Sequence, residues 1–416
     1  MRLAAFAGGC TLQAAESVCG DDLDVVDGLA SLTDCGLTRV EGTDEAPRFT
    51  MLEPIREYAV ERFEESGEAE QLRRRHAAYF LGLAEEAEPN LRGSPGDWLD
   101  HLEREHDNFR TALDRLEASG DGETALRLAA ALWRFWYLKG HLAEGRRRLE
   151  SVLPTDERPT AARAKALNGA AVMAVNSGDT EAAKLRAEEA LALHRKLGDA
   201  WGAAYSVFML GNAEDDAGKA EQLYEESVRV FREHGDEHSA LLVTRNLAAI
   251  YTSLGDGERA RALYEDNLER AQATHNDRLE ASTLGALALI ALDEGRIEDA
   301  ASMLETSLRI HGRLHDVLDT AVDLCRFAAA LAQQGKAATA ARLLASFESM
   351  GDEVGIRRSG VAEMNETTLA AIRAQLDDAA FAEAWEQGRK LTVGEAVTLA
   401  LDAETERVLY DLKGGN

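Results

Sequence analysis

The stretch "NLAAIYTSLGDGERARALYEDNL", residues 246–268, decides the fold of this chain. Apolar residues at helical spacing lie on both sides of Gly255, and a glycine there supplies the left-handed backbone on which one helix ends before an antiparallel helix begins. Ala260 follows five residues after the glycine, and its small side chain lets the two helices cross closely. The stretch therefore predicts a helical hairpin.

The same hairpin recurs along the chain. Loop glycines separated by 37 to 40 residues stand between apolar stretches of helical period, at Gly140, Gly178, Gly218, Gly255, Gly295 and Gly335. A small residue follows five positions later in most copies, at Gly145, Ala183, Ala260, Ala300 and Ala340. A regular period of this length predicts an array of stacked hairpins. The third copy has lost about three residues, which we place in "AGKAEQLYEES", residues 217–227.

The offsets within each hairpin resemble those of the tetratricopeptide repeat (TPR) family, whose leucine, small residue, loop glycine, alanine and aromatic residue fall in the same frame. The copies here repeat every 37 to 40 residues, which is longer than the roughly 34 residues of that family, and the family's closing proline is missing. The resemblance implies an all-α solenoid whose stacked hairpins leave one curved inner surface exposed for binding.

The TPR resemblance also implies which residues line that concave face. The positions carried over from the family's frame mix amides, aromatic rings and a few charges, which suits a peptide or small-molecule effector. The predicted effector-binding residues are Lys165, Asn168, Asn176, Tyr205, Phe208, Asn212, Asp216, Arg245, Thr252 and Asp293. The family's clamp for a terminal carboxylate is not matched, because Arg245 is followed four residues later by Ala249 rather than by asparagine. The alternative that these are ordinary surface residues of a protein-interaction scaffold stays open.

The first 68 residues do not follow the repeat. The segment "LQAAESVCG" (12–20) predicts a short helix, and "LDVVDGLASLTDCGLTRV" (23–40) predicts a helix that runs into a strand. The segment "EGTDEAPRFTML" (41–52) supplies a turn and a second strand, and a helix begins at Pro54, where proline suits the first helical turn. This order predicts a small winged-helix domain with a two-stranded wing.

Winged helices often bind DNA, but the charge of this one opposes that function. Residues 1–65 contain five basic and fourteen acidic residues, a balance of −9. The helix expected to enter a DNA groove, Val25–Leu32, has no Arg, Lys, Asn or Gln to contact base edges. A DNA-binding winged-helix transcription factor is therefore the weaker alternative, and we expect no direct binding to nucleic acid.

Several segments resemble the STAND-class signalling ATPases of bacteria, which include AfsR-like, LuxR-family and MalT-like regulators. They are "RLAAFAGGCTLQAAESVCG" (2–20), "LEPIREYAVERFEESGE" (52–68), "RRRHAAYFLGLAEEAEP" (73–89), "WLDHLEREHDNFRTAL" (98–113) and "FAEAWEQGRKLTVGEAVTLAL" (381–401). The sequence has no GxxxxGK[ST] motif, and no helix-turn-helix pattern follows residue 401. The chain thus resembles the regulatory half of such a protein, and a nucleotide-binding domain is expected upstream.

This resemblance implies a non-enzymatic sensor that binds a protein, peptide or small-molecule effector and relays its presence to a signalling ATPase or transcription regulator. The chain is then either a fragment or a stand-alone adaptor, and its effector, oligomeric state and ATPase-contacting surface are not predicted. The expected domains are a winged helix at 1–68, connecting helices at 69–120, TPR-like repeats at 121–345 and C-terminal capping helices at 346–416.

Composition favours a cytoplasmic, well-folded protein. Its 46 basic and 75 acidic residues give a formal charge of −29, which would repel nucleic acids and anionic membranes, and no apolar run reaches the length of a membrane span. Four cysteines without a CxxC pair predict neither disulfides nor a metal site. The histidines of "HLEREH" (101–106) are five residues apart and point away from each other on a helix. We expect no metal, no cofactor and no catalytic activity.

Two further groups of residues attract a functional interpretation. The stretch "ALWRFWYLKG" (131–140) concentrates Trp133, Phe135, Trp136 and Tyr137, and aromatic rings at helical spacing favour packing over a ligand site or a docking surface for a nucleotide-binding domain. Histidines near predicted helix ends are explained by the preference for cations in the last helical turn, and they are His76, His194, His234, His275, His311 and His315.

Overall fold

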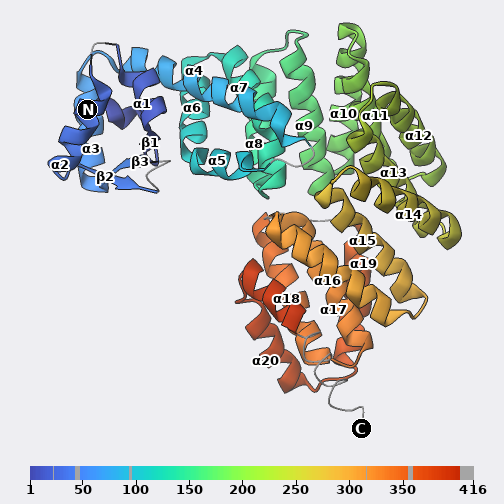
Figure 1. Cartoon of the computed structure of the whole chain (residues 1–416). Coiled ribbons are helices and arrows are strands. Elements are labelled where there is room, and N and C mark those ends of the chain that lie inside the picture. The colour runs from blue at the N-terminus through green and yellow to red at the C-terminus, as the bar shows by residue number, and fades with distance from the viewer. Residues whose placement is uncertain (22, 43–46, 93–95, 315, 355–358, 403–416) are drawn as a thin grey trace. The chain divides into compact units, whose positions relative to one another are not determined.

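The computed structural model describes the chain except for residues 22, 43–46, 93–95, 315, 355–358 and 403–416, and for the side chains of 351–363. The described part is helical apart from one small sheet (Figure 1). It divides into two compact units, Met1–Phe135 with Leu149–Arg158 and Trp136–Arg148 with Pro159–Asn416.

The first unit begins with a winged helix, as predicted. Its elements are η1 (Arg2–Ala5), β1 (Cys10–Thr11), α1 (Leu12–Cys19), α2 (Val25–Asp34), β2 (Thr38–Glu41), β3 (Arg48–Met51) and α3 (Glu53–Glu65). They are followed by α4 (Ala69–Ala87), η2 (Glu88–Leu91), α5 (Trp98–Arg104), α6 (His106–Ser119), α7 (Gly122–Leu138), α8 (Leu142–Val152) and η3 (Leu153–Thr155), of which α7 and α8 cross the boundary between the units.

The sheet of the winged helix has a third strand that the sequence analysis did not predict. The strand order is β1-β3-β2, and all pairs are antiparallel, with Phe49 opposite both Cys10 and Val40. Gly9 makes the extra pairing possible, because a Cβ at this position would lie 2.5 Å from the Phe49 carbonyl oxygen. A two-residue strand is too short to give an alternating pattern, so only the close approach at Gly9 marks it.

Arg48 joins the wing to the helices that follow it. Its guanidinium donates to the carbonyl oxygens of Gly8 (2.8 Å) and Gly9 (3.1 Å) and forms an ion pair with Glu105. Glu105 also accepts a hydrogen bond from Asn108 Nδ2 at 2.7 Å. A buried pair of this kind is stable only when its remaining polar atoms are satisfied, and the Gly8–Gly9 carbonyls and Asn108 provide those partners.

His76 lies inside the first unit, in the middle of α4 rather than near a helix end. Its ring packs against Phe6 and Phe80, with centroid distances of 5.4 Å and 4.6 Å, and its Nε2 is 3.3 Å from Asn108 Oδ1. Burial lowers the pKa of His76 to about 3, so the ring is neutral. The prediction of a last-turn cation is therefore wrong for this residue. His315 lies outside the described residues.

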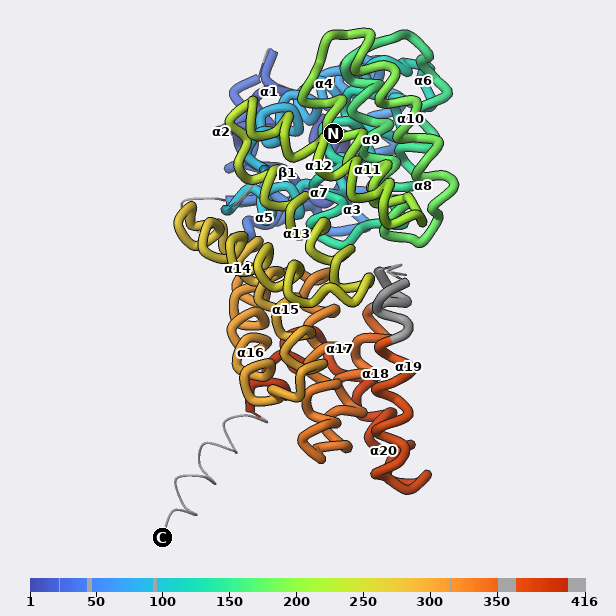
Figure 2. The backbone as a smooth tube through the Cα atoms, turned by 90° about the vertical axis from the view of Figure 1, so that its right-hand side faces the viewer, coloured from blue at the N-terminus to red at the C-terminus, as the bar shows by residue number. Residues whose placement is uncertain are grey.

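The second unit contains the repeats. Its helices are α9 (Ala161–Asn176), α10 (Thr180–Leu197), α11 (Ala200–Asn212), α12 (Ala217–Glu233), α13 (Glu237–Ser253), α14 (Gly257–Ala273), α15 (Asp277–Asp293), α16 (Ile297–Arg313), α17 (Val317–Gln333), α18 (Ala337–Val354), α19 (Ser359–Arg373) and α20 (Asp378–Gly388). Each helix packs on the next from α9 to α18, and α19 and α20 pack on α17 and α18. The tube in Figure 2 shows this succession. The predicted TPR-like solenoid is confirmed.

The third hairpin departs from the predicted frame. Gly218 is not a left-handed loop residue, because it lies in the first turn of α12, whose N-cap is Asp216. Asp215 therefore occupies the loop position. The residues are lost from α11, which has 13 residues where α13, α15 and α17 have 17. The loop after α11 is one residue longer than the loop after α13, so the net loss is three residues. The predicted location of the loss in residues 217–227 is wrong, since α12 keeps 17 residues.

A second turn, between hairpins, repeats with the same period. Gly198, Gly235 and His275 have positive φ angles of 73°, 71° and 52°, and each is followed by a side chain that caps the next helix. These caps are Asp199, Asp236 and Asn276. This second turn is visible in the sequence as an Asp or Asn that directly follows Gly198, Gly235 and His275. The sequence analysis considered only the loop glycines within the hairpins and did not predict it.

The small residues predicted at the hairpin crossings are completely buried. Ala183, Ala260, Ala300 and Ala340 have no exposed surface, and Ala220 takes the equivalent place in the third hairpin. Seven residues after Ala220, Ala260 and Ala300, a polar side chain of the second helix donates a hydrogen bond to a backbone carbonyl of the first helix. The bonds run from Ser227 to Ala204 (2.6 Å), from Asn267 to Leu241 (2.9 Å) and from Ser307 to Ala281 (2.7 Å). These bonds fix the register of each hairpin.

Ala260→Leu should destabilise the repeats by about 1–3 kcal/mol, because extra methyl groups at a closed helix crossing force the helices apart. The measurement is urea unfolding of the full chain. The matched control is Ala262→Leu on the exposed side of the same helix, which should change the free energy of unfolding by less than about 0.5 kcal/mol. Equal effects of the two substitutions would contradict a tight crossing at Ala260.

His76→Phe should reduce the sensitivity of the chain to acid. The unfolded chain protonates this histidine near pH 6.5, whereas the folded pKa of about 3 keeps it neutral, so the wild type loses stability as the pH falls. Between about pH 7.5 and about pH 5.5 we expect the wild type to lose about 1.4 kcal/mol more than the variant. Asn108 Oδ1 keeps the Ala7 N–H as a donor. Parallel pH profiles in urea unfolding would rule out a neutral His76.

Candidate effector-binding face of the repeats

The predicted effector-binding residues lie on the repeats at three levels of exposure. Those that are buried are Asn168, Asn176, Tyr205 and Phe208. Those that are partly exposed are Lys165, Asn212, Arg245 and Thr252. The exposed ones are Asp216, which caps α12, and Asp293 in the last turn of α15.

Asn168 connects three helices from the inside. Its Nδ2 is 3.1 Å from His194 Nε2, and its Oδ1 accepts from Ser206 Oγ at 2.8 Å. His194 Nδ1 in turn lies 2.9 Å from Asp199 Oδ2. Burial lowers the pKa of His194, and Gly202 leaves space for its ring, since a Cβ there would lie 2.2 Å from Nδ1. Asn168 therefore holds α9, α10 and α11 together.

Tyr205 and Phe208 form an aromatic row inside the third hairpin, between α11 and α12. Tyr205 stacks on Trp201 at 5.7 Å, and Phe208 lies 5.8 Å from Tyr205 and 6.0 Å from Tyr224. Asn176 donates to the Val172 carbonyl within its own helix. In this conformation these residues serve packing and offer little surface to an effector.

Asn212 and Arg245 are brought together in a polar cluster that the sequence analysis only partly identified. Asn212 Oδ1 accepts from Tyr224 Oη (2.8 Å) and from Asn246 Nδ2 (2.9 Å), and Arg245 Nη2 lies 3.2 Å from Asn246 Oδ1. We call these four residues, from α11, α12 and α13, the Asn212 cluster. Burial raises the pKa of Tyr224, so its hydroxyl stays protonated and acts as a donor.

The local sequence explains how this cluster forms. Gly211 lets the Tyr224 ring approach α11, because a Cβ there would lie 2.6 Å from the ring. Tyr224 stands nine residues after Asp215, as Tyr264 stands nine after Gly255. The sequence analysis placed the third loop at Gly218, three residues too late, so Tyr224 did not fall at the expected position nine residues after the loop. Asn246, which follows Arg245 directly, was not among the predicted effector-binding residues.

The predicted aromatic cluster is mostly buried. Trp133, Phe135 and Trp136 are at most 5% exposed, while Tyr137 is partly exposed. In the first unit, Phe135 packs edge-on against His106 at 5.1 Å. In the second, Trp136 lies against Gly145, where a Cβ would approach Trp136 Cβ to 2.9 Å. Their surface is used in packing within each unit.

The MalT-like TPR region family matches residues 163–400, which is more than half of the chain. The chain belongs to this family. The match covers the repeats from α9 onward, including the Asn212 cluster. Within the part of the chain that the structure describes, no helix is both long enough and apolar enough to cross a membrane.

The chain is also similar in sequence to curated bacterial proteins. Proteins of Mycobacterium bovis and Mycobacterium tuberculosis, named as candidate HTH-type transcriptional regulators, are 34% identical over 215 residues. The match covers 48% of this chain and 24% of each relative. The chain thus spans about a quarter of the length of these regulators.

Solved structures with helical repeats are also similar. They include a STAND protein with a TPR sensor from Pyrococcus horikoshii, with 14% identity and a TM-score of 0.45 over 99% of this chain and 64% of that one. NprR in complex with its cognate peptide NprX has 14% identity and a TM-score of 0.47 over 80% of this chain and 97% of that one. At such scores the likeness does not establish a shared ligand.

Tyr224→Phe should destabilise the chain by about 1 kcal/mol, because it removes one donor to Asn212 and leaves Asn246 in place. Asn212→Ala should cost about 1–3 kcal/mol, since two donors then lose their acceptor. In urea unfolding the double variant should cost less than the sum of the two. Tyr58→Phe, at a tyrosine that is 62% exposed, is the control and should have no effect. Additive costs would show that the Asn212–Tyr224 bond contributes nothing.

Proposed function

We propose that this chain is a regulatory module, not an enzyme, and that the Asn212 cluster is the centre of its effector-binding face. The cluster carries the proposal because it presents the amides of Asn212 and Asn246 and the guanidinium of Arg245 from α11 and α13. The buried Tyr224 of α12 holds Asn212 in place through a hydrogen bond. Donors fixed in advance lose little entropy on binding. The membership in the MalT-like TPR region family supports a regulatory role for the repeats.

The effector that fits this cluster is a protein segment, a peptide or a small molecule that carries hydrogen-bond acceptors or a negative charge. Arg245 is the cation of the cluster, and it is partly exposed. A net charge of −29 disfavours a strongly anionic polymer. The exposed Asp216, at the cap of α12, and the partly exposed Thr252 on α13 would extend the contact along the same helices, and the partly exposed Lys165 would extend it to α9.

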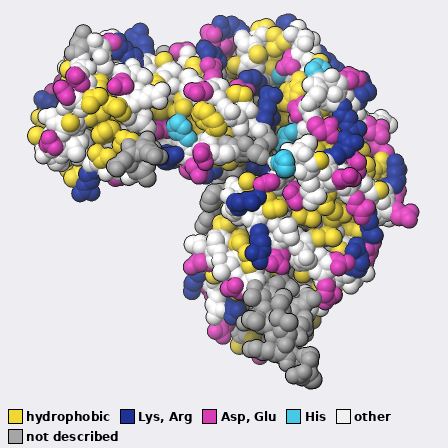
Figure 3. Space-filling model, in the orientation of Figure 1, with side chains coloured by type: hydrophobic (Ala, Val, Ile, Leu, Met, Phe, Trp, Pro, Cys, Tyr) yellow, Lys and Arg dark blue, Asp and Glu magenta, His cyan; other side chains and the backbone are white. Residues whose placement is uncertain are grey.

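The winged helix would pass the signal to a signalling ATPase or a transcription regulator. Its large apolar side chains that remain 37–62% exposed are Met1, Leu23, Val26, Leu37, Val40, Leu52 and Tyr58. Figure 3 shows apolar side chains gathered on this part of the surface. Apolar side chains gathered on one surface favour a protein contact, and the regulators similar to this chain have additional length that would supply the partner.

Arg245→Ala should weaken effector binding by about tenfold or more, which is about 1.4 kcal/mol. A thermal-shift screen of defined peptides and metabolites identifies a ligand, because a molecule that binds the native state raises its melting temperature. The matched control is Arg309→Ala on α16, where the arginine is exposed and paired with Glu305. An effector that binds both variants equally well would place the site elsewhere.

Direct DNA binding by the winged helix is the alternative that a gel shift at low salt separates from this proposal. We expect no shift of duplex DNA, because α2 carries no Arg, Lys, Asn or Gln and residues 1–65 have a balance of −9. A shift that weakens with added salt would instead support a DNA-binding factor.

A further inference from the structure

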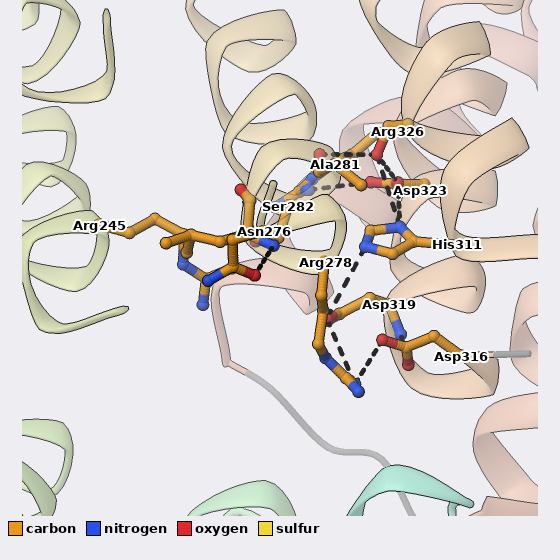
Figure 4. A network of polar contacts seen from close by, with 12 residues as sticks. Arg245, Asn276, Arg278, Ala281, Ser282, His311, Asp316, Asp319, Asp323 and Arg326 are labelled. Carbon is orange, nitrogen blue, oxygen red and sulfur yellow. Dashed lines mark hydrogen bonds and ion pairs between the residues drawn. The ribbon is translucent and has the colours of Figure 1, made fainter. Parts of the chain in front are cut away.

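A buried group of charged side chains joins α15, α16 and α17 (Figure 4). It comprises Arg278 in the first turn of α15, His311 in the last turn of α16, and Asp316, Asp319 and Asp323 at the start of α17. His311, Asp316 and Asp323 are at most 2% exposed. Burying the carboxylates of Asp316 and Asp323 is costly unless cations or donors balance them, so their partners define what the group can do.

The His311 ring is oriented by a carboxylate. Its Nδ1 lies 2.9 Å from Asp323 Oδ2, and Asp323 is held by Arg326 at 3.0 Å and by Ser307. Gly285 accommodates this pair, because a Cβ there would lie 2.5 Å from both Arg326 Nη1 and Asp323 Oδ1. A proton on Nδ1 that points to Asp323 leaves the lone pair on Nε2. This is the carboxylate–histidine arrangement that stands behind many metal ligands.

The other ring nitrogen faces two carboxylates. His311 Nε2 has no hydrogen-bond partner among the described residues although the ring is fully buried, and it lies 4.0 Å from Asp319 Oδ2. One ligand atom each from His311, Asp316 and Asp319 fall within 4.8 Å of one another. Bonds of about 2.0–2.2 Å to a tetrahedral ion separate its ligand atoms by roughly 3.5 Å, so small side-chain rotations would close the set.

Two arginines approach the three aspartates. Arg278 lies beside Asp316 and Asp319, and Arg326 pairs with Asp323. Arg278 contacts Asp316 and lies 3.9 Å from Asp319, which places it on the same carboxylates. Its side chain is 16% exposed. A divalent ion in its place would put one more positive charge beside these carboxylates.

We propose that His311, Asp316 and Asp319 form a site for a divalent transition metal of the zinc class, and that the metal exchanges with the Arg278 guanidinium. One imidazole with two carboxylates favours Zn²⁺, Co²⁺ or Ni²⁺ over Mg²⁺ and Ca²⁺, which prefer oxygen ligands alone. The metal would tie the end of α16 to the start of α17 and free the start of α15. This inference is independent of the effector proposed for the Asn212 cluster.

The competing explanation is a proton. Burial lowers the pKa of His311, but the carboxylates of Asp323, Asp319 and Asp316 raise it by more, and a protonated His311 would also add a positive charge beside them. Arg278 would then remain in place, and no metal would bind. The two explanations differ in what Zn²⁺ or Co²⁺ does to the purified chain.

The experiment is a titration of the tag-free, chelator-treated full chain with Co²⁺ and Zn²⁺ chloride, with Mg²⁺ as the comparison ion. We expect one Co²⁺ per chain with the visible absorption of a low-coordinate site, displacement by Zn²⁺ and a raised melting temperature, with no effect of Mg²⁺. Asp319→Asn and His311→Gln should weaken binding at least about tenfold. Arg278→Met should strengthen it, because the competing cation is gone.

Two controls keep the result specific. Asp299→Asn changes an exposed carboxylate on the same helix as His311, and His234→Gln removes an exposed histidine; neither should alter binding. Asp319 is 14% exposed, so its isosteric replacement preserves the fold even if His311→Gln does not. No Co²⁺ binding, or equal binding by wild type and Asp319→Asn, would overturn the proposal and favour a protonated His311 beside the aspartates.

Discussion

The apolar face of each helical hairpin can be covered only by the next hairpin, and the rest of the second unit depends on this constraint. A hairpin can stack only if its two helices cross closely, which explains the fully buried alanines at Ala183, Ala220, Ala260 and Ala300. A larger side chain at one crossing would push the two helices of that hairpin apart and disturb their packing against the hairpins before and after it. Stability in such an array is shared between adjacent units and not drawn from one central core.

Close crossings bring polar groups into the same seams. Ser227, Asn267 and Ser307 each donate to a carbonyl of the preceding helix, and Asn168 accepts from Ser206 between hairpins. A single hydrogen bond of this kind adds only about 1 kcal/mol, but a shifted register would leave its donor buried and unpaired at a greater cost. The polar residues thus select one register among those that the apolar surfaces would allow.

The repeats and the order of the winged-helix elements could be predicted from the sequence because their signals are local. Gly255, Ala260 and their counterparts recur at a fixed period, and each position has one physical role. The loop of the third hairpin was predicted at the wrong residue, because α11 is short and Gly218, in the first turn of α12, falls at the spacing expected for a loop glycine. Strand β1 has only two residues and so has no pattern of its own.

The candidate sites were less predictable, because they depend on which hairpin faces which. Asn212 and Arg245 could be selected from the TPR frame, but Tyr224 and Asn246 join them only through the stacking of α11, α12 and α13. Likewise Arg278 and Asp316 are 38 residues apart, and neither has a distinctive neighbour in the sequence. Tertiary pairs of this kind follow from the register of the solenoid, so they could be found only after the position of each loop was corrected.

A buried charged group is expensive to keep, and this bears on why the seam of α15, α16 and α17 differs from the others. Apolar side chains of similar volume often stabilise a protein as well as buried ion pairs do, and the seam between α13 and α14 has the neutral donor Asn267 at the equivalent place. Here position 285 must be glycine because a Cβ would collide with Arg326 and Asp323. His311 Nε2 is buried without a hydrogen-bond partner among the described residues. Packing alone does not require these features, and so they are better explained by a cation or proton that the seam takes up.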